Sequence, residues 1–221
     1  MKHLTALLST LLLVLTSCIN SDTIDGEVVP MLTDIVTFEG NSGGGAVFSF
    51  NASEDSPLVT LTADTPLSTD DFTAGNRVLL YYRPTAGQGV YASGPISIVA
   101  AGPVNNGEVK TTSTAELDGW DANPVFVYSM WRSGAYINLH CRLPYYNEPR
   151  RFGLATTAEA LKQEIVDLYL VHQLPEPVNS HDRAYYASFD ISAVWGLRSC
   201  RGVRVHVANS NLPKDTFEFL K

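Results

Sequence analysis

Residues 46–63 read AVFSFNASEDSPLVTLTA, and two runs within this stretch alternate apolar and polar side chains. The runs are Ala46–Asn51 and Leu58–Ala63, and polar residues with one proline separate them. Alternation with a period of two is typical of strands that bury one face, because successive side chains point to opposite sides of a sheet. The inward face is predicted to consist of Phe48, Phe50, Val59 and Leu61.

Comparable short stretches recur between Gly, Pro, Asn and Asp residues, and no long segment keeps a helical period. The first half predicts strands at Asp34–Phe38, Ala46–Asn51, Leu58–Ala63, Arg77–Arg83 and Pro95–Ala100. The second half predicts strands at Val125–Met130, Tyr136–Leu143, Arg151–Ala155, Val166–Leu174, Arg183–Ile191, Gly202–Asn209 and Thr216–Leu220. The predicted fold is therefore all-β: a small OB-like five-stranded barrel followed by an antiparallel β-sandwich of about seven strands.

Turn-forming residues with little to bury separate the two sets of strands, at Gly102–Gly107 and Thr111–Thr114. The predicted division is a signal peptide at 1–17, a polar tether at 18–27, an OB-like barrel at 28–107, a linker at 108–117 and a sandwich at 118–221. Because the linker offers few apolar side chains, we expect the two domains to share little core and to fold independently.

The chain begins with Lys2, an apolar run from Leu4 to Leu15, and then Thr16-Ser17-Cys18. This order is typical of an export signal, and roughly 12 apolar residues are too few to span a bilayer. Leu15-Thr16-Ser17-Cys18 resembles the bacterial lipobox, which implies cleavage before Cys18 and attachment to the membrane through an N-terminal lipid. The alternative is an ordinary cleaved signal with an incidental cysteine.

The residues after Cys18 indicate where the protein is located. Ile19 stands where an acidic residue would resemble an inner-membrane retention signal, so we expect an outer-membrane lipoprotein of the cell envelope, facing either the periplasm or the surface. Asp22-Thr23-Ile24 resembles the short O-glycosylation motif of Bacteroidota, which makes Thr23 a candidate glycosylation site.

The charge balance excludes one class of partner. Lys and Arg number 15 against 23 Asp and Glu, which leaves a net charge of −8 at pH 7. An acidic surface repels phosphate backbones, and the basic residues never form a stripe interleaved with aromatics. We therefore expect no nucleic-acid partner.

Signatures of catalysis and metal binding are weak throughout. Gly40-Asn41-Ser42-Gly43-Gly44 fits a nucleophile-elbow pattern, but it joins two strands and is better explained as a hairpin tip. The histidines lack the spacing of zinc ligands, and His172 shares the parity of core leucines. Glu54-Asp55 is interpreted as solvated loop charge. No catalytic residue, metal site or cofactor is therefore expected.

The loop Leu143–Arg151 is the best candidate for ligand binding, because loops carry function more often than sheets do. It offers Tyr145, Tyr146, Asn147, Arg150 and Arg151. Aromatic faces beside polar side chains suit sugars or peptide segments. The alternative is that one tyrosine packs inward and the arginines keep the loop soluble.

Cys141 and Cys200 remain once Cys18 is acylated, and an exported protein encounters an oxidising compartment. A disulfide between them would close a loop of roughly 60 residues and contribute about 4 kcal/mol. Free cysteine is also a small buried hydrophobe, so two separate core thiols are the alternative.

The stretches Trp131–Asn138, WRSGAYIN, and Phe189–Ser192, FDIS, follow the lipobox and the OB-like half in order. Together they resemble the NigD-like lipoproteins of Bacteroidota, which implies an N-terminal OB domain and a C-terminal β-sandwich. The family name comes from a gene cluster linked to bacteriocin production, and the resemblance implies no catalytic residues.

These features favour a non-catalytic envelope lipoprotein, a binding or accessory module for an unidentified sugar, peptide or protein partner. One alternative is a structural or assembly lipoprotein that acts through protein–protein contacts. Another, by family resemblance, is a component of a bacteriocin-linked system. An exposed aromatic groove would favour the first reading and a flat apolar patch the second.

Overall fold

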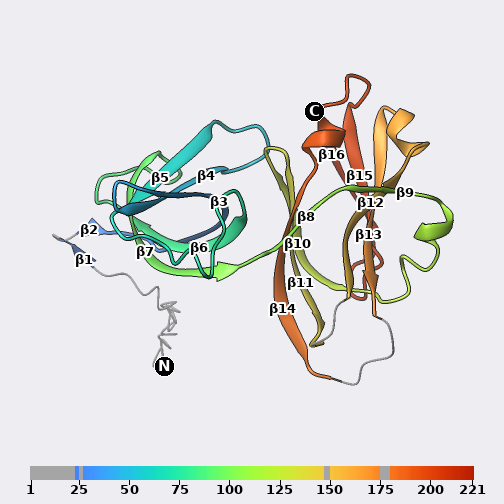
Figure 1. Cartoon of the computed structure of the whole chain (residues 1–221), viewed down its shortest axis with the longest axis horizontal. Coiled ribbons are helices and arrows are strands. Elements are labelled where there is room, and N and C mark those ends of the chain that lie inside the picture. Colours follow the sequence, from blue (N-terminus) through green and yellow to red (C-terminus); the bar gives the residue numbers. More distant parts are fainter. Residues whose placement is uncertain (1–22, 25–26, 147–149, 175–179) are drawn as a thin grey trace, which may run out of the picture.

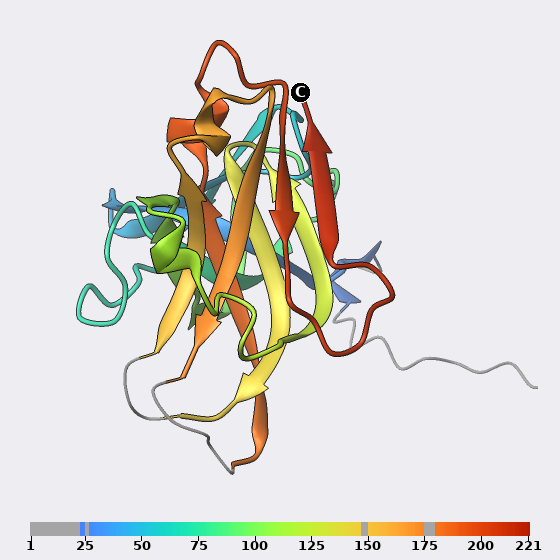
Figure 2. The ribbon, with the colours of Figure 1, turned by 90° about the vertical axis from the view of Figure 1, so that its right-hand side faces the viewer.

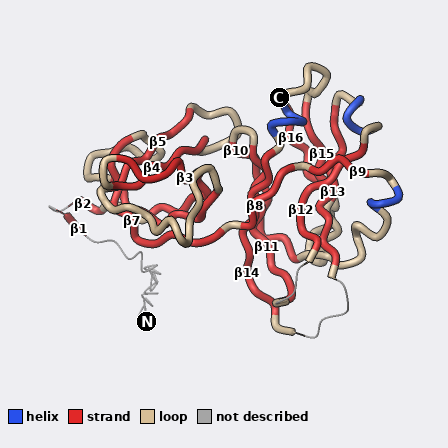
Figure 3. The backbone as a smooth tube through the Cα atoms, in the orientation of Figure 1, coloured by secondary structure: helices blue, strands red, loops and turns tan. Residues whose placement is uncertain are grey.

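A computed structural model describes residues 23–24, 27–146, 150–174 and 180–221. A barrel and a two-layered sandwich lie side by side, with the barrel at the left of the view and the sandwich at the right (Figure 1). Strands dominate, and the few helical turns are short (Figure 3). Among the described residues, none of the helices has the length and apolar character needed to cross a membrane. The predicted all-β class is confirmed.

The barrel consists of β3 (Leu32–Ser42), β4 (Gly45–Asn51), β5 (Leu58–Ala63), β6 (Arg77–Pro84) and β7 (Gly94–Pro103). Its order is β3-β4-β5-β7-β6, and it closes through antiparallel pairing of β3 with β6. β5 and β7 are parallel, and the other neighbours are antiparallel. The predicted five-stranded barrel is therefore confirmed.

Alternation along β4 and β5 places Phe48, Phe50, Val59 and Leu61 in the barrel core, as predicted. Phe48 and Leu61 are at most 1% exposed, whereas Thr60 and Thr62 lie on the exposed outer face. Ser42 pairs with Gly45 at the end of the β3–β4 hairpin, so the elbow-like glycine stretch is a hairpin tip. The prediction of a hairpin tip is confirmed.

The sandwich has a four-stranded sheet next to the barrel and a five-stranded sheet on the side away from the barrel (Figure 1), which faces the viewer in Figure 2. The first sheet contains, in order, β10 (Phe126–Ser133), β11 (Tyr136–Pro144), β14 (Asp182–Asp190) and β8 (Asn105–Glu108). The second contains β16 (Thr216–Leu220), β15 (Gly202–His206), β13 (Ile165–Gln173), β12 (Arg151–Thr157) and β9 (Lys110–Thr112).

The sandwich differs from the prediction in strand number and direction. Its sheets contain four and five strands in the described chain, against about seven expected, and three neighbouring pairs are parallel. The added strands are β8 and β9, which pair with β14 and β12 across residues expected to end the barrel and form the linker. Their side chains are polar and mostly exposed, so no hydrophobic alternation marked them.

Short elements complete the chain. Within the predicted tether, β1 (Thr23–Ile24) and β2 (Glu27–Val28) pair with each other, and the candidate glycosylation residue Thr23 lies in β1. Cys18 lies outside the described residues. The other elements are the 3-10 helices η1 (Ala115–Leu117) and η2 (Ala160–Lys162) and the single helical turn α1 (Ser192–Trp195).

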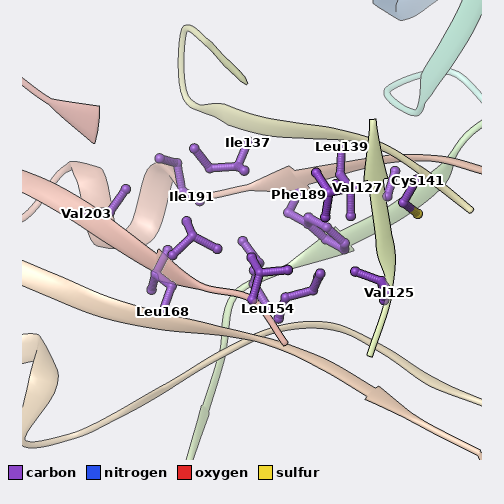
Figure 4. Packing of buried hydrophobic residues seen from close by; sticks show 14 of the residues in the cluster. Val125, Val127, Ile137, Leu139, Cys141, Leu154, Leu168, Phe189, Ile191 and Val203 are labelled. Atoms are coloured by element: carbon purple, nitrogen blue, oxygen red, sulfur yellow. The ribbon is translucent and has the colours of Figure 1, made fainter. Parts of the chain in front are cut away.

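The sandwich core explains what the two cysteines do. Cys141 and Cys200 are both free and buried in the same apolar cluster, so the predicted disulfide is wrong. Cys141 lies near Val125, whereas Cys200 precedes β15, whose Val203 lies toward the opposite end of the cluster (Figure 4). Burial raises the pKa of Cys141 to about 12. Both thiols therefore serve as core hydrophobes.

Candidate binding cleft

The β10–β11 hairpin joins the sandwich to the barrel, and Arg132 is its main anchor. The Arg132 side chain is 0% exposed and donates to both carboxylate oxygens of Asp55, at 2.8 Å each. Its Nη1 also donates to the carbonyl of Gly134 at 2.8 Å, and its guanidinium lies 4.5 Å from the centre of the Trp195 ring. Asp55, interpreted from the sequence as solvated loop charge, therefore holds a buried cation, and the pair lowers the pKa of Asp55.

The same hairpin requires glycine at position 134, because its backbone lies close to the barrel there. The Gly134 amide donates to the carbonyl of Glu54 at 2.7 Å. Gly134 has a φ of 57°, and a Cβ atom there would lie 2.3 Å from Oδ1 of Asn51. Ser133 donates its hydroxyl proton to the Asn51 carbonyl. A larger residue at 134 would force the Asn51 side chain to move and would have to adopt a left-handed conformation that L side chains rarely adopt.

Arg77 is a second buried cation between the two bodies. It donates to the Ile35 carbonyl at 2.6 Å and to the Ser188 hydroxyl at 3.2 Å, and it lies 4.3 Å from the centre of the Tyr136 ring. Ser188 in turn donates to Asn138 of β11 at 2.7 Å. Burial lowers the pKa of Arg77 to about 10, so it remains charged at neutral pH.

An apolar cluster completes the contact. Ile35, Leu79 and Val104 are buried together, and Trp131 and Tyr186 of the sandwich pack against them. The two bodies therefore share a small apolar cluster besides their separate cores, and independent folding of each stays a prediction. Alternation along one strand carries no information on which outer face a second domain covers.

A cleft of ≈ 530 Å³ opens beside this cluster, within the size range that takes small ligands. Both bodies contribute to its walls. Its lining consists of Thr33, Asp34, Ile35, Phe50, Asn51, Ala52, Leu79, Tyr91, Ser129, Trp131, Ser133 and Tyr186. Aromatic rings, small hydroxyl groups and one carboxylate thus share one hollow, and Lys, Arg and His do not occur in this lining.

Asp34 is the charged group of the cleft. Tyr82 donates its hydroxyl proton to Oδ2 of Asp34 at 3.0 Å, and no cation among the described residues forms an ion pair with this carboxylate. Burial raises the pKa of Asp34, and the Tyr82 hydrogen bond and the field of Arg77 oppose that rise. Asp34 is therefore a partly desolvated anion without a counter-cation in its site.

Tyr91 also lines the hollow and has an unusual backbone conformation. Its φ is 60°, the left-handed region that non-glycine residues seldom adopt. The side chain is 46% exposed, and its ring meets the Phe50 ring edge-on with centroids 6.2 Å apart. The charge of Asp34 raises the pKa of Tyr91, because it opposes ionisation of the phenol. Backbone strain of this kind clusters at functional sites.

A row of stacked rings continues from the cleft along the outer face of the four-stranded sheet. The Tyr186 ring stacks on His140, with centroids 4.2 Å apart and planes 7° apart. His140 in turn contacts Tyr128, which is 49% exposed. Burial lowers the pKa of His140, so its imidazole is neutral at pH 7. The row thus extends the aromatic wall without adding positive charge.

The loop favoured by the sequence lies elsewhere, at the end of β11, and its described side chains contact other parts of the protein. Tyr145 stacks on His181 at 5.3 Å, and Arg183 covers its ring at 4.0 Å. Arg150 donates to the carbonyls of Pro144 and Tyr146, and Arg151 donates to Gln173. Asn147 lies outside the described residues. Ligand binding by this loop stays a prediction.

His172 occupies the core position predicted for it. It is 2% exposed and hydrogen-bonds through Nδ1 to the Asn123 carbonyl at 2.8 Å. Arg150 lies 3.4 Å from Nε2. In the part of the chain that the structure describes, no three His, Cys, Asp or Glu side chains converge as metal ligands.

No family model and no curated protein sequence matches this chain. Solved structures do match, beginning with a protein of unknown function, DUF1344, from Bacteroides vulgatus: the TM-score is 0.64 at 14% identity, over 86% of this chain and 90% of that chain. A candidate lipoprotein from Bacteroides fragilis gives 0.56 at 14% identity, over 86% and 96%. A NigD-like immunity protein from Bacteroides caccae gives 0.55 at 15% identity, over 85% and 91%. The resemblance to NigD-like proteins is therefore confirmed at the level of the fold.

Proposed function

We propose that this chain is a non-catalytic lipoprotein of the bacterial cell envelope that binds a partner in the cleft between barrel and sandwich. The proposal rests on the Asp34 carboxylate, which has no ion pair among the described residues and shares its hollow with the exposed Tyr91 and the partly buried Trp131. A structural interface alone has no need of a strained, half-exposed tyrosine or a carboxylate without a counter-ion. Ligand sites commonly combine apolar walls with a few polar groups.

The proposed location in the cell envelope rests on the lipobox-like sequence that ends at Cys18. A candidate lipoprotein among the structures with this fold supports the same assignment. We place the protein at the outer membrane, facing the periplasm or the cell surface. Replacing Cys18 with Ser should leave the protein unacylated and release it from the membrane fraction; unchanged membrane partition would refute the lipid anchor.

Blocking the cleft tests the binding role. Ser129 lines the cleft from an exposed position in β10, so Ser129→Trp should fill it while leaving the fold intact. Protein purified from its native envelope and examined by native mass spectrometry should carry a bound molecule that the Ser129→Trp protein lacks. Tyr145→Ala, in the loop at the end of β11, is the matched control and should keep the molecule.

The same comparison shows how the proposal fails. If Tyr145→Ala loses the bound molecule and Ser129→Trp keeps it, the loop is the site and the cleft is not. If neither variant alters what the protein carries, binding in the cleft is refuted.

A second candidate function is membership of a bacteriocin-linked system through protein–protein contacts. The NigD-like immunity protein with the same fold favours it, and the exposed rings around Tyr128 are the surface it would use. In that case Tyr128→Ala should abolish association with the partner. Ser129→Trp should weaken this association only as far as the added ring obstructs the partner on the same sheet face.

A further inference from the structure

We propose that the cleft recognises an organic cation on an aliphatic stem, the ammonium or guanidinium group of a lysine or arginine side chain in a peptide partner. This inference rests on the proposed function, since it names the chemistry of the ligand for the same cleft. Its basis is the arrangement of one carboxylate, aromatic faces and an apolar wall in a hollow of ≈ 530 Å³.

Asp34 supplies the negative charge of the cleft. Tyr82 bonds to one oxygen, Oδ2, and no hydrogen bond from a described residue reaches Oδ1. Arg77, whose field acts on Asp34, donates its own hydrogen bonds to the Ile35 carbonyl, Thr37 and Ser188. A partly buried carboxylate with a free oxygen and no counter-ion gains most from a ligand that supplies positive charge.

The aromatic walls select the same chemistry. Tyr91, Trp131 and Tyr186 line the cleft with Phe50, and a cation over an aromatic face is attracted by the ring quadrupole. Ile35 and Leu79 offer an apolar surface for the methylene groups of a lysine or arginine stem. A neutral sugar would use the rings too, but it would leave the charge of Asp34 without a partner.

Two other hollows in the described chain lack this combination. A cavity of ≈ 500 Å³ at the edge of the sandwich contains Lys110, Arg150 and Arg151 beside its carboxylates. A groove over β13 holds Asp167, which is already paired with Arg204 and His206. The net charge of −8 also favours the approach of cationic over anionic partners.

The test is a titration of the purified chain followed by NMR shifts of the Trp131 indole. The probes are N-acetyl-lysinamide and N-acetyl-argininamide, with N-acetyl-norleucinamide as the neutral counterpart of lysine. We expect saturable, low-millimolar binding of the two cations and about tenfold weaker binding of norleucine, because a single residue offers few contact atoms. Cadaverine tests a free amine: binding tighter than that of the lysine probe would overturn the peptide source.

Asp34→Asn is the decisive variant. Its amide oxygen can still accept the Tyr82 hydrogen bond, so the fold should persist while the charge is removed. We expect about tenfold weaker binding of both cations and an unchanged affinity for norleucine. Asp70→Asn, at an exposed loop carboxylate, is the matched control and should bind as the unmodified protein does.

Three results would overturn the inference. Equal affinity for lysine and norleucine, unchanged lysine binding in Asp34→Asn, or no saturable shift with either cation each excludes a cation site. A different outcome is that Ser129→Trp loses all probe binding while the unmodified protein binds lysine and norleucine equally well. This result would support the cleft as a ligand site and refute only its preference for cations.

Discussion

Arg132 and Asp34 are both charges at the junction of barrel and sandwich, and the protein treats them in opposite ways. Arg132 is fully buried and paired with Asp55 through two hydrogen bonds. Asp34 accepts one hydrogen bond from Tyr82 and has no ion pair in the described chain. The paired charge holds the two bodies together, whereas the unpaired one weakens the fold and is available to a ligand.

We expect the largest effect when the chain is divided at the junction of barrel and sandwich. A fragment of residues 104–221 keeps β8 and β9, which pair with β14 and β12, whereas a fragment of residues 116–221 lacks both strands. We expect the longer fragment to unfold cooperatively, with lower stability than the whole chain, and the shorter one to show no cooperative transition in urea. Equal cooperativity of the two fragments would show that β8 and β9 are dispensable.

Removing the paired cation should have the next largest effect. Arg132→Met loses the ion pair with Asp55 and the contact with Trp195, and we expect about 3 kcal/mol less stability in urea unfolding. Lys110→Met, at an exposed cation on β9, is the control and should change stability by less than about 0.5 kcal/mol. A loss as small as that of the control would mean that the buried pair does not secure the junction.

Gly134→Ala tests the close approach of the hairpin without touching a charge. The methyl group would meet Oδ1 of Asn51 at 2.3 Å, and the φ of 57° is unfavourable for alanine. We expect a loss of about 2 kcal/mol in thermal or urea unfolding. Restoration of stability by a second change, Asn51→Gly, would assign the loss to this contact; no restoration would assign it to the backbone conformation alone.

The two aspartates should respond to amidation with opposite signs. The folded pKa of Asp55 is lowered, so its stabilisation is present above the unfolded value near 3.8 and disappears as the pH falls through the folded value. Asp55→Asn should therefore destabilise the protein at pH 7, by about 1 kcal/mol because the carboxylate is largely exposed. That deficit should shrink on acidification, and urea unfolding at several pH values measures it.

Asp34→Asn should give the smallest effect, a stabilisation. The folded pKa of Asp34 is raised, so the folded state binds its proton more tightly and the charged form costs stability at neutral pH. We expect a gain of up to about 1 kcal/mol at pH 7, or about 2–4 °C in Tm, which disappears as the pH falls through the raised pKa. Destabilisation at pH 7 would make Asp34 a structural residue and remove the basis of the comparison.

Local pattern was enough to find most of the strands. The predicted Leu58–Ala63 and Thr216–Leu220 coincide with β5 and β16, and the remaining predictions fall on strands with ends displaced by a few residues. The period of two is a property of neighbouring residues, so it can be read without knowing what the strand packs against. The two sandwich strands that were missed, β8 and β9, are polar and lie at sheet edges.

The candidate site was not found in this way. The sequence directed attention to Tyr145 and Tyr146 because aromatic loop residues are conspicuous, whereas Asp34 and Tyr91 stand 57 positions apart and carry no shared motif. A φ of 60° at Tyr91 leaves no signal in residue type. Trp131 was part of the stretch that carried the family resemblance, but nothing in it indicated that the stretch docks against the barrel.

The sequence by itself determined the all-β class, the barrel strands, their outward and inward faces and the hairpin tip at the elbow-like glycine stretch, because each follows from short-range periodicity and turn chemistry. Only the tertiary structure decided that two outer faces meet, that Arg132 is buried against Asp55 and that Asp34 is left without a cation. The physical reason is that burial and charge pairing depend on surfaces brought together from distant parts of the chain, and alternation along one strand cannot specify which surface will cover it.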